Sequence, residues 1–108
     1  MHWLVSAITS AGLVLAVAVA AAEPTGERRA ELENLLVQDC GSCHGLTFRG
    51  GLGPALTREA LADKSVEYVH LTIWHGRPGT AMPPWRGLLS ESESRWLAQL
   101  LFSGEVNR

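Results

Sequence analysis

The sequence predicts a small all-α domain, and three observations support this fold class. Apolar residues recur at helical spacing in three segments. These segments are residues 26–39, 66–75 and 90–104. Serine and glycine residues stand where two of these helices should begin and end. No segment shows the sustained alternation of apolar and polar residues that is typical of a strand.

The first 22 residues are expected to be a secretory signal peptide. They are mostly apolar and contain none of the chain's 9 basic and 11 acidic side chains. Ala18–Ala20 and Ala20–Ala22 both give the small-x-small pattern that signal peptidase accepts. The alternative is an uncleaved anchor, because about 20 apolar residues can span a bilayer. In either case residues 23–108 form the folded domain, which we expect in the periplasm.

The first predicted helix, residues 26–39, has Thr25 as its expected N-cap and leads directly into Cys40. Its apolar face is expected to contain Ala30, Leu32, Leu35 and Leu36. A short helical turn is expected at residues 57–63. The second helix, residues 66–75, should follow an N-cap at Ser65 and end at Gly76. Its buried stripe is expected to contain Val66, Val69, Ile73 and Trp74.

His70 falls off this stripe, so we expect its side chain to be solvated. The third helix has the clearest signals, because Ser90 and Glu93 form a capping box and Gly104 is placed to end the helix. Its buried face is expected to contain Trp96, Leu97, Leu100 and Leu101.

Composition excludes two classes of protein. The formal net charge of −2 argues against nucleic-acid binding, which needs a basic surface. A small net charge with apolar residues throughout the second half argues against intrinsic disorder. A domain of this size is close to the limit at which side chains alone build a sufficient core, so a cofactor, metal or disulfide is expected.

The two cysteines, Cys40 and Cys43, are followed by His44 in the pattern C-x-x-C-H, which is typical of haem c attachment. Two thiols at this spacing can add to the two vinyl groups on one edge of a porphyrin. The adjacent imidazole can then bind the iron. We therefore expect one covalently attached haem c, with His44 as the proximal ligand.

Three other interpretations of the cysteines fit the sequence less well. A redox-active dithiol normally accompanies a βαβ pattern, which the sequence lacks. A zinc site could combine the cysteines with His70 and His75, but 26 residues separate Cys43 from His70. A disulfide between Cys40 and Cys43 would close a loop too short to constrain the unfolded chain much.

The sixth iron ligand is expected to be Met82, which lies between Thr80-Ala81 and two prolines. The ordinary alternative for a methionine is core packing. His70 and His75 are competing ligands, and His75 could instead complement a helix dipole in the last turn of its helix. An open sixth position would permit ligand binding instead of simple electron transfer.

The C-x-x-C-H motif, Gly53-Pro54, Met82-Pro83 and the capped C-terminal helix together resemble the class I cytochromes c. The resemblance covers residues 26–104. The loops at 49–57 and 76–90 are similar to those of the small monohaem cytochrome c-55X proteins that accompany cytochrome cd1 nitrite reductase in denitrifying bacteria. The resemblance to the class I cytochromes c implies the class I fold, with three main helices and loops around one haem.

The resemblance also implies roles for particular residues. The helices at the two ends of the domain should cross, with Leu32, Leu35 and Leu36 against Trp96, Leu97 and Leu100. The carbonyl of Pro54 should accept a hydrogen bond from His44. Trp74 and Trp85 both qualify as the tryptophan that touches a haem propionate in bacterial relatives.

We therefore expect a monomeric electron carrier rather than an enzyme. Its expected partners are redox proteins, namely a nitrite reductase or an upstream electron donor, without stable membrane association once the signal is cleaved. One alternative is an accessory redox role while the haem of the nitrite reductase is made. A haem sensor or small peroxidase is the other, and it requires an open sixth site.

Overall fold

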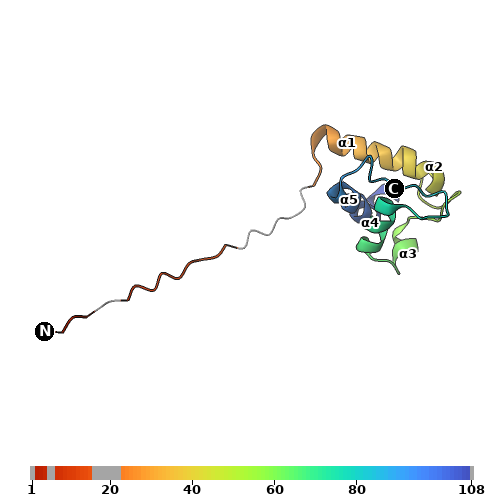
Figure 1. Cartoon of the computed structure of the whole chain (residues 1–108). Coiled ribbons are helices and arrows are strands. Elements are labelled where there is room, and N and C mark those ends of the chain that lie inside the picture. The colour runs from red at the N-terminus through yellow and green to blue at the C-terminus, as the bar shows by residue number, and fades with distance from the viewer. Residues whose placement is uncertain (1, 5–6, 16–22, 108) are drawn as a thin grey trace.

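The computed structural model describes residues 2–4, 7–15 and 23–107, and Figure 1 shows the helical domain that begins at Gly26. Residues 2–4 and 7–15 have no regular secondary structure and are exposed. Within these described ranges, no helix has the length and apolar character needed to cross a membrane. The expected cleavage positions after Ala20 and Ala22 lie outside the described residues.

The described ranges contain helices and turns but no strand, which confirms the all-α prediction for them. The elements are α1 (Gly26–Leu35), η1 (Leu36–Cys40), α2 (Gly41–His44), α3 (Arg58–Leu61), α4 (Val66–His75), α5 (Glu91–Ser103) and η2 (Glu105–Asn107). η1 is a π-helical segment and η2 is a 3₁₀ turn. The first predicted helix, residues 26–39, is thus divided between α1 and η1, and α2 extends the helical run beyond it.

α1, η1 and α2 form one continuous helical run, because the residues at both junctions have right-handed helical backbone angles. A π turn holds one residue more than an α turn, so it changes which face the following residues occupy. Thr25 is the N-cap by backbone conformation, although its side chain makes no capping hydrogen bond. Leu32 and Leu36 are buried. Ala30 is exposed, contrary to prediction. It lies two positions before the buried Leu32, and residues two positions apart are separated by about 200° around a helix, so Ala30 lies on the opposite side.

The other helix boundaries follow from side-chain caps. Thr57 and Ser65 accept hydrogen bonds from the backbone N–H groups three residues later, at the starts of α3 and α4. At α5 the predicted capping box is confirmed, because Ser90 and Glu93 each accept from the other's backbone N–H. Gly104 ends α5 in the left-handed conformation, with φ of 73°.

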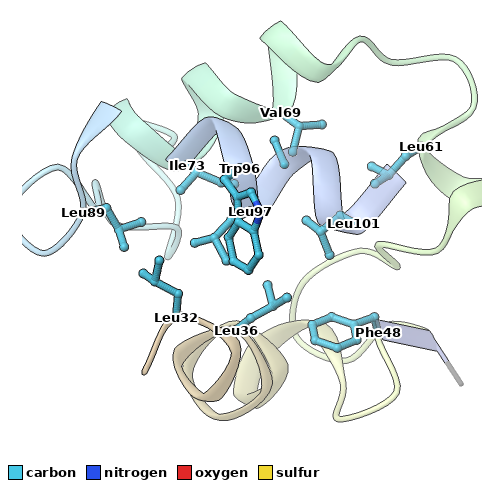
Figure 2. Packing of buried hydrophobic residues seen from close by; sticks show 11 residues of the cluster. Leu32, Leu36, Phe48, Leu61, Val69, Ile73, Leu89, Trp96, Leu97 and Leu101 are labelled. Carbon is cyan, nitrogen blue, oxygen red and sulfur yellow. The ribbon is translucent and has the colours of Figure 1, made fainter. Parts of the chain in front are cut away.

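The core lies where α4 and α5 pack together and the first helical run closes over them (Figure 2). Leu32 and Leu36 point toward Trp96 and Leu97, as expected for crossing terminal helices. Leu35 and Leu100 are only half-buried at the edge of this contact. The buried apolar residues are Leu32, Leu36, Phe48, Leu61, Val69, Ile73, Leu89, Trp96, Leu97, Ala98 and Leu101.

Polar contacts also join α1 to α5. A terminal guanidinium nitrogen of Arg28 donates to Oε1 of Glu93 at 3.0 Å and to the carbonyl of Leu88 at 3.1 Å. The guanidinium of Arg29 lies 5.6 Å from the ring centroid of Trp96. These contacts cover the edge of the apolar seam between the two helices.

The prediction that His70 is solvated is wrong. Its side chain is 0% exposed, and its Nδ1 lies 3.0 Å from Oγ of Ser94, which is also 0% exposed. The Ser94 hydroxyl donates to the carbonyl of His70 at 3.2 Å, so Nδ1 must be the donor in the other bond. Burial lowers the pKa of His70. Close packing of α4 on α5 buries a wider arc of α4 than the apolar stripe indicates.

Candidate haem site

Cys40, Cys43 and His44 lie at the end of the first helical run. Cys40 and His44 are half-buried, whereas Cys43 is exposed. The run ends at Gly45, whose φ is 91°. A side chain at Gly45 would meet the carbonyl oxygen of Gly50 at 2.7 Å, so glycine is required at this turn. The turn directs the chain back across the histidine.

The ring of His44 is fixed by the loop that follows. Its Nδ1 lies 2.7 Å from the carbonyl oxygen of Pro54. A carbonyl can only accept, so Nδ1 carries the proton and Nε2 keeps a lone pair for a metal ion. The predicted bond between Pro54 and His44 is thus present, and it selects the tautomer that can bind iron.

The same loop lies tightly against the imidazole. The N–H of Gly53 donates to the carbonyl of Cys43 at 2.7 Å, and the N–H of Gly50 donates to that of His44 at 2.8 Å. A Cβ at Gly53 would lie 2.8 Å from both Cε1 and Nδ1 of His44. The imidazole can therefore occupy this position only because Gly53 has no side chain.

A cavity of about 350 Å³ opens beside these residues. Cys40, Cys43 and His44 line it from the first helical run, and Met82 and Trp85 line it from the loop before α5. These residues, except Cys43, also line an adjoining apolar recess of about 30 Å³ against Leu97 and Leu101. The cavity and the recess together form one crevice. The predicted cysteines and both predicted axial ligands line this crevice, and the recess adds apolar walls from the core.

Met82 is held by hydrogen bonds to Arg77 and Thr80 of its own loop. The N–H of Arg77 donates to the carbonyl of Met82 at 3.1 Å. Oγ1 of Thr80 lies 3.3 Å from the N–H of Met82 and donates to the carbonyl of Arg77 at 2.7 Å. Gly76 is buried, and a side chain there would lie 2.6 Å from the backbone of Pro83 and Pro84. The loop is therefore tied to the end of α4.

The competing histidine ligands lie elsewhere. Neither His70 nor His75 lines the crevice. The Nδ1 atom of His70 bonds Ser94, and His75 is exposed. Among the described residues, no three His, Cys, Asp or Glu side chains gather as a metal site. The zinc site considered from the sequence is therefore not formed, and Met82 is the candidate that shares the cavity with His44.

The structure also separates the two tryptophan candidates. Trp85 lines both parts of the crevice, whereas Trp74 lines neither. The indole Nε1 of Trp85 is buried without a hydrogen-bond partner. A buried N–H donor without an acceptor is costly, so this atom fits a wall that a polar cofactor completes.

The protonation of Cys40 differs from that of a redox-active dithiol. Burial and the neighbouring charge of Asp39 raise the pKa of the Cys40 thiol to about 11. Reactive C-x-x-C sites lower the thiol pKa instead, because the thiolate is the nucleophile. The donor set thus fits a haem c: two thiols at the cavity wall, one oriented imidazole, one thioether and an unsatisfied indole N–H.

The chain is similar to known cytochromes. The family model described as "Cytochrome C oxidase, cbb3-type, subunit III" matches residues 27–101. The chain is 54% identical over 104 residues to cytochrome c55X of Stutzerimonas stutzeri, covering 91% of each chain. It also matches the solved structure of "c-type cytochrome NirC", with a TM-score of 0.74 and 55% identity, covering 77% of this chain and 98% of that chain.

A second solved structure contains a similar domain. "Dihydro-heme d1 dehydrogenase NirN in complex with DHE" matches with a TM-score of 0.60 and 36% identity. The match covers 65% of this chain but only 15% of that protein. Fold, cysteine motif and these matches define a c-type cytochrome. Within that class, the chain belongs to the cytochrome c55X family, which confirms the resemblance drawn from the sequence.

Proposed function

We propose that this chain is a periplasmic single-haem electron carrier, with the haem attached through Cys40 and Cys43 and its iron bound by His44 and Met82. One observation carries the proposal. His44, already oriented by Pro54, lines the same cavity as Met82 and both cysteines. In this assignment residues 1–22 are a signal peptide and residues 23–108 are the cytochrome domain.

When bound, the haem supplies a one-electron couple between Fe(III) and Fe(II). The hydrogen bond from His44 to Pro54 makes the imidazole a better donor and fixes its plane. Met82 contributes a neutral thioether, which favours the less charged ferrous state and raises the potential. The apolar recess formed by Leu36, Leu97 and Leu101 acts in the same direction by excluding water.

Exposed residues at the edge of the crevice form a surface through which electrons can pass to a partner. Cys43 is exposed, and the nearby side chains of Leu46 and Leu52 are 69% and 95% exposed. Leu52 lines the cavity itself. Scattered exposed leucines are common, but this pair belongs to the loop that holds the proximal histidine. We assign this rim to contact with a redox partner.

A nitrite reductase of denitrification, or a redox enzyme of the same pathway, is the partner that the resemblance implies. Membership of the cytochrome c55X family supports this assignment. In each encounter, an electron leaves the carrier and reduces the acceptor by one equivalent. Stopped-flow mixing of the reduced protein with purified nitrite reductase would measure this step directly.

An accessory role in haem maturation is the second candidate. It is supported by the similar domain within a dihydro-heme d1 dehydrogenase. The carrier would then accept the electrons that are released when the dehydrogenase oxidises its dihydro-haem substrate. Incubating the oxidised protein with the dehydrogenase and its substrate separates the two roles: rapid reduction there, with no transfer to nitrite reductase, favours maturation.

Export is tested by the mass of the protein recovered from the periplasm. Cleavage after Ala20 or Ala22 leaves a chain beginning at Ala21 or Glu23. Recovery of the intact 108-residue chain in the membrane fraction would instead support an anchor.

Haem attachment and ligation are tested by spectroscopy of the purified protein. The alkaline pyridine spectrum should show a haem with two thioether bonds, and the double variant Cys40→Ala/Cys43→Ala should accumulate no stable red protein. Ferric protein should show the weak long-wavelength band of methionine-bound iron. Absence of this band, together with ready CO binding, would favour a sensor or peroxidase with an open sixth site. A red, stably folded double cysteine variant would refute the haem c assignment.

A further inference from the structure

Phe48 is the one buried residue of the loop that follows the C-x-x-C-H motif. Among residues 42–60, all of which the structure describes, every other residue is exposed or half-buried. The side chain of Phe48 is 0% exposed, and Figure 2 shows its ring directed toward Leu36 in the core. The loop is therefore anchored to the core at a single side chain.

The backbone of Phe48 has a conformation that an aromatic residue rarely adopts. Its φ is 59°, and it is the only non-glycine residue with positive φ among those that the structure describes. In this left-handed region the Cβ atom crowds the following carbonyl oxygen, so the conformation costs free energy for a bulky residue. Such strain persists only where the surroundings impose it, and it is concentrated at functional sites. Burial of the ring is the interaction that can offset this cost.

The strained turn is bonded to the loop that orients His44. The N–H of Phe48 donates to the carbonyl of Gly45 at 2.9 Å, and the carbonyl of Phe48 accepts from the N–H of Leu56 at 2.8 Å. Leu56 follows Pro54 by two positions, and the Pro54 carbonyl lies 2.7 Å from Nδ1 of His44. The hydrogen bond between Phe48 and Leu56 thus fixes the segment that carries the Pro54 carbonyl.

Phe48 does not touch the space in which the haem would lie. It lines neither the cavity of about 350 Å³ nor the apolar recess, and it does not line a further cavity of about 260 Å³ that shares walls with both. Any effect of Phe48 on the iron must therefore pass through the backbone of the loop.

We infer that Phe48 is a positioning residue, whose buried ring holds the left-handed turn that keeps the Pro54 carbonyl on the imidazole of His44. Because this hydrogen bond acts on a haem iron, the inference rests on the proposed function. The bond makes the imidazole a better donor, which stabilises the ferric state and lowers the reduction potential. Release of the loop from its anchor should therefore weaken the bond and raise the potential.

The test compares Phe48→Ala with Phe48→Leu and Leu32→Ala in the purified haem-bound protein. Leu32 is the matched control, because it is also apolar and 0% exposed but lies in α1 and lines none of these cavities. Proton NMR of the reduced, diamagnetic protein measures exchange of the His44 Nδ1 hydrogen with water. This exchange should be about tenfold faster in Phe48→Ala than in Leu32→Ala, because a left-handed turn without its anchor opens more often. Phe48→Leu, which keeps an apolar anchor, should restore most of the difference.

The sign of the change in reduction potential is a second readout. Phe48→Ala should raise the potential above that of the parent, because the imidazole becomes a weaker donor. A loss of core packing alone admits water to the haem, which favours the more highly charged ferric state and lowers the potential. Leu32→Ala should therefore leave the potential unchanged or lower it.

Equal Nδ1 exchange in Phe48→Ala and Leu32→Ala would overturn the inference, as would a potential in Phe48→Ala at or below that of the parent. Exchange in Phe48→Leu as fast as in Phe48→Ala would also overturn it, since an apolar anchor would then hold nothing. If Phe48→Ala does not accumulate, Phe48→Gly takes its place, because glycine adopts this φ without strain and lacks the ring. Its exchange and potential should change in the same directions, and values equal to those of Leu32→Ala would contradict the role of the ring.

Failure of the proposed function is recognised separately, because the parent protein would then lack covalent haem or the methionine band.

Discussion

Met82 is the residue whose replacement separates a closed electron carrier from an open haem protein. In Met82→Ala, haem attachment should persist, because Cys40, Cys43 and His44 are intact. The reduction potential should fall as water or another ligand replaces the thioether, and the reduced protein should bind CO. Redox titration and CO difference spectra measure both effects.

The matched variant Met82→His keeps the sixth position closed with a better donor to ferric iron. It should lower the potential without CO binding. If Met82→Ala leaves the spectrum, potential and CO reactivity unchanged, Met82 is not the ligand. His70 and His75 cannot replace it without rearrangement, since neither lines the crevice.

Gly53 gives a second prediction for a single residue. In Gly53→Ala, the new methyl group would lie 2.8 Å from the His44 ring, so the imidazole must tilt and its bond to Pro54 must weaken. We expect a lower yield of haem-bound protein and an altered iron–histidine stretching band in resonance Raman spectra. Gly87→Ala is the control, because a Cβ there meets nothing within 4 Å. Equal yields and spectra for both variants would contradict the prediction.

The sequence predicts the residues of the candidate site better than their surroundings. Cys40, Cys43 and His44 are fixed by a spacing that the attachment chemistry itself requires, and the structure brings Met82 to the same cavity. The choice between Trp74 and Trp85 needs three-dimensional packing, because Trp74 lies in the last turn of α4 and Trp85 lies in the loop before α5, and the sequence does not show which of them faces the cavity.

Among the helices, the contact between α1 and α5 depends on Glu93. Hydrogen bonds from Arg28 and from the backbone of Ser90 lower the pKa of Glu93 to about 2. Its ordinary value is 4.5, so its contribution to stability is complete above pH 4.5 and is lost as the pH falls toward 2. Glu93→Ala removes both the ion pair and the cap and should cost about 1–2 kcal/mol.

Glu93→Gln retains an acceptor for the cap but not the charge. Its free energy of unfolding, measured with urea, should fall less between pH 5 and about pH 3 than that of the parent. Glu31→Gln is the control, because Glu31 pairs with the same Arg28 but is exposed. An identical acid dependence in the parent and Glu93→Gln would show that this ion pair contributes nothing.

The contact between α4 and α5 depends on the buried pair His70 and Ser94. Ser94→Ala would leave the Nδ1 hydrogen of His70 buried without an acceptor. We expect a loss of about 1–3 kcal/mol in the free energy of unfolding. Ser92→Ala, on the exposed side of the same helix, should change it by less than about 0.5 kcal/mol. Similar urea midpoints for the two variants would refute this role.

Helix ends were more predictable than helix interiors. Ser65, Ser90 and Gly104 act locally, so their roles follow from a few neighbouring residues. The π-helical turn at Leu36–Cys40 has no such local signal, because it depends on how the cysteine segment meets the rest of the domain. Burial of His70 likewise depends on a partner 24 positions later.

At the scale of the whole molecule, the distribution of charge favours an apolar surface for docking of the proposed carrier on its partner. The chain has a formal net charge of −2, and Lys64 is its single lysine. The rim at the crevice instead presents the exposed Leu46 and Leu52, with Arg49 and Arg86 on the flanking loops. Electron-transfer contacts are small, below about 1,200 Å² in total, and must dissociate quickly. An apolar rim satisfies both needs without a charged patch.

The rate of electron transfer to a true partner should therefore fall only weakly as salt rises, because screening acts on charge pairs and leaves apolar contact largely unaffected. Leu52→Ser should slow the second-order rate without changing the reduction potential, since Leu52 is 95% exposed and contributes little to folding. Leu71→Ser, at an exposed position on α4 away from the crevice, should leave the rate unchanged. Stopped-flow rates over a range of salt concentrations measure both effects. A decline of several decades between low and physiological ionic strength would show that docking depends on charge, and equal rates for the two leucine variants would remove Leu52 from the contact.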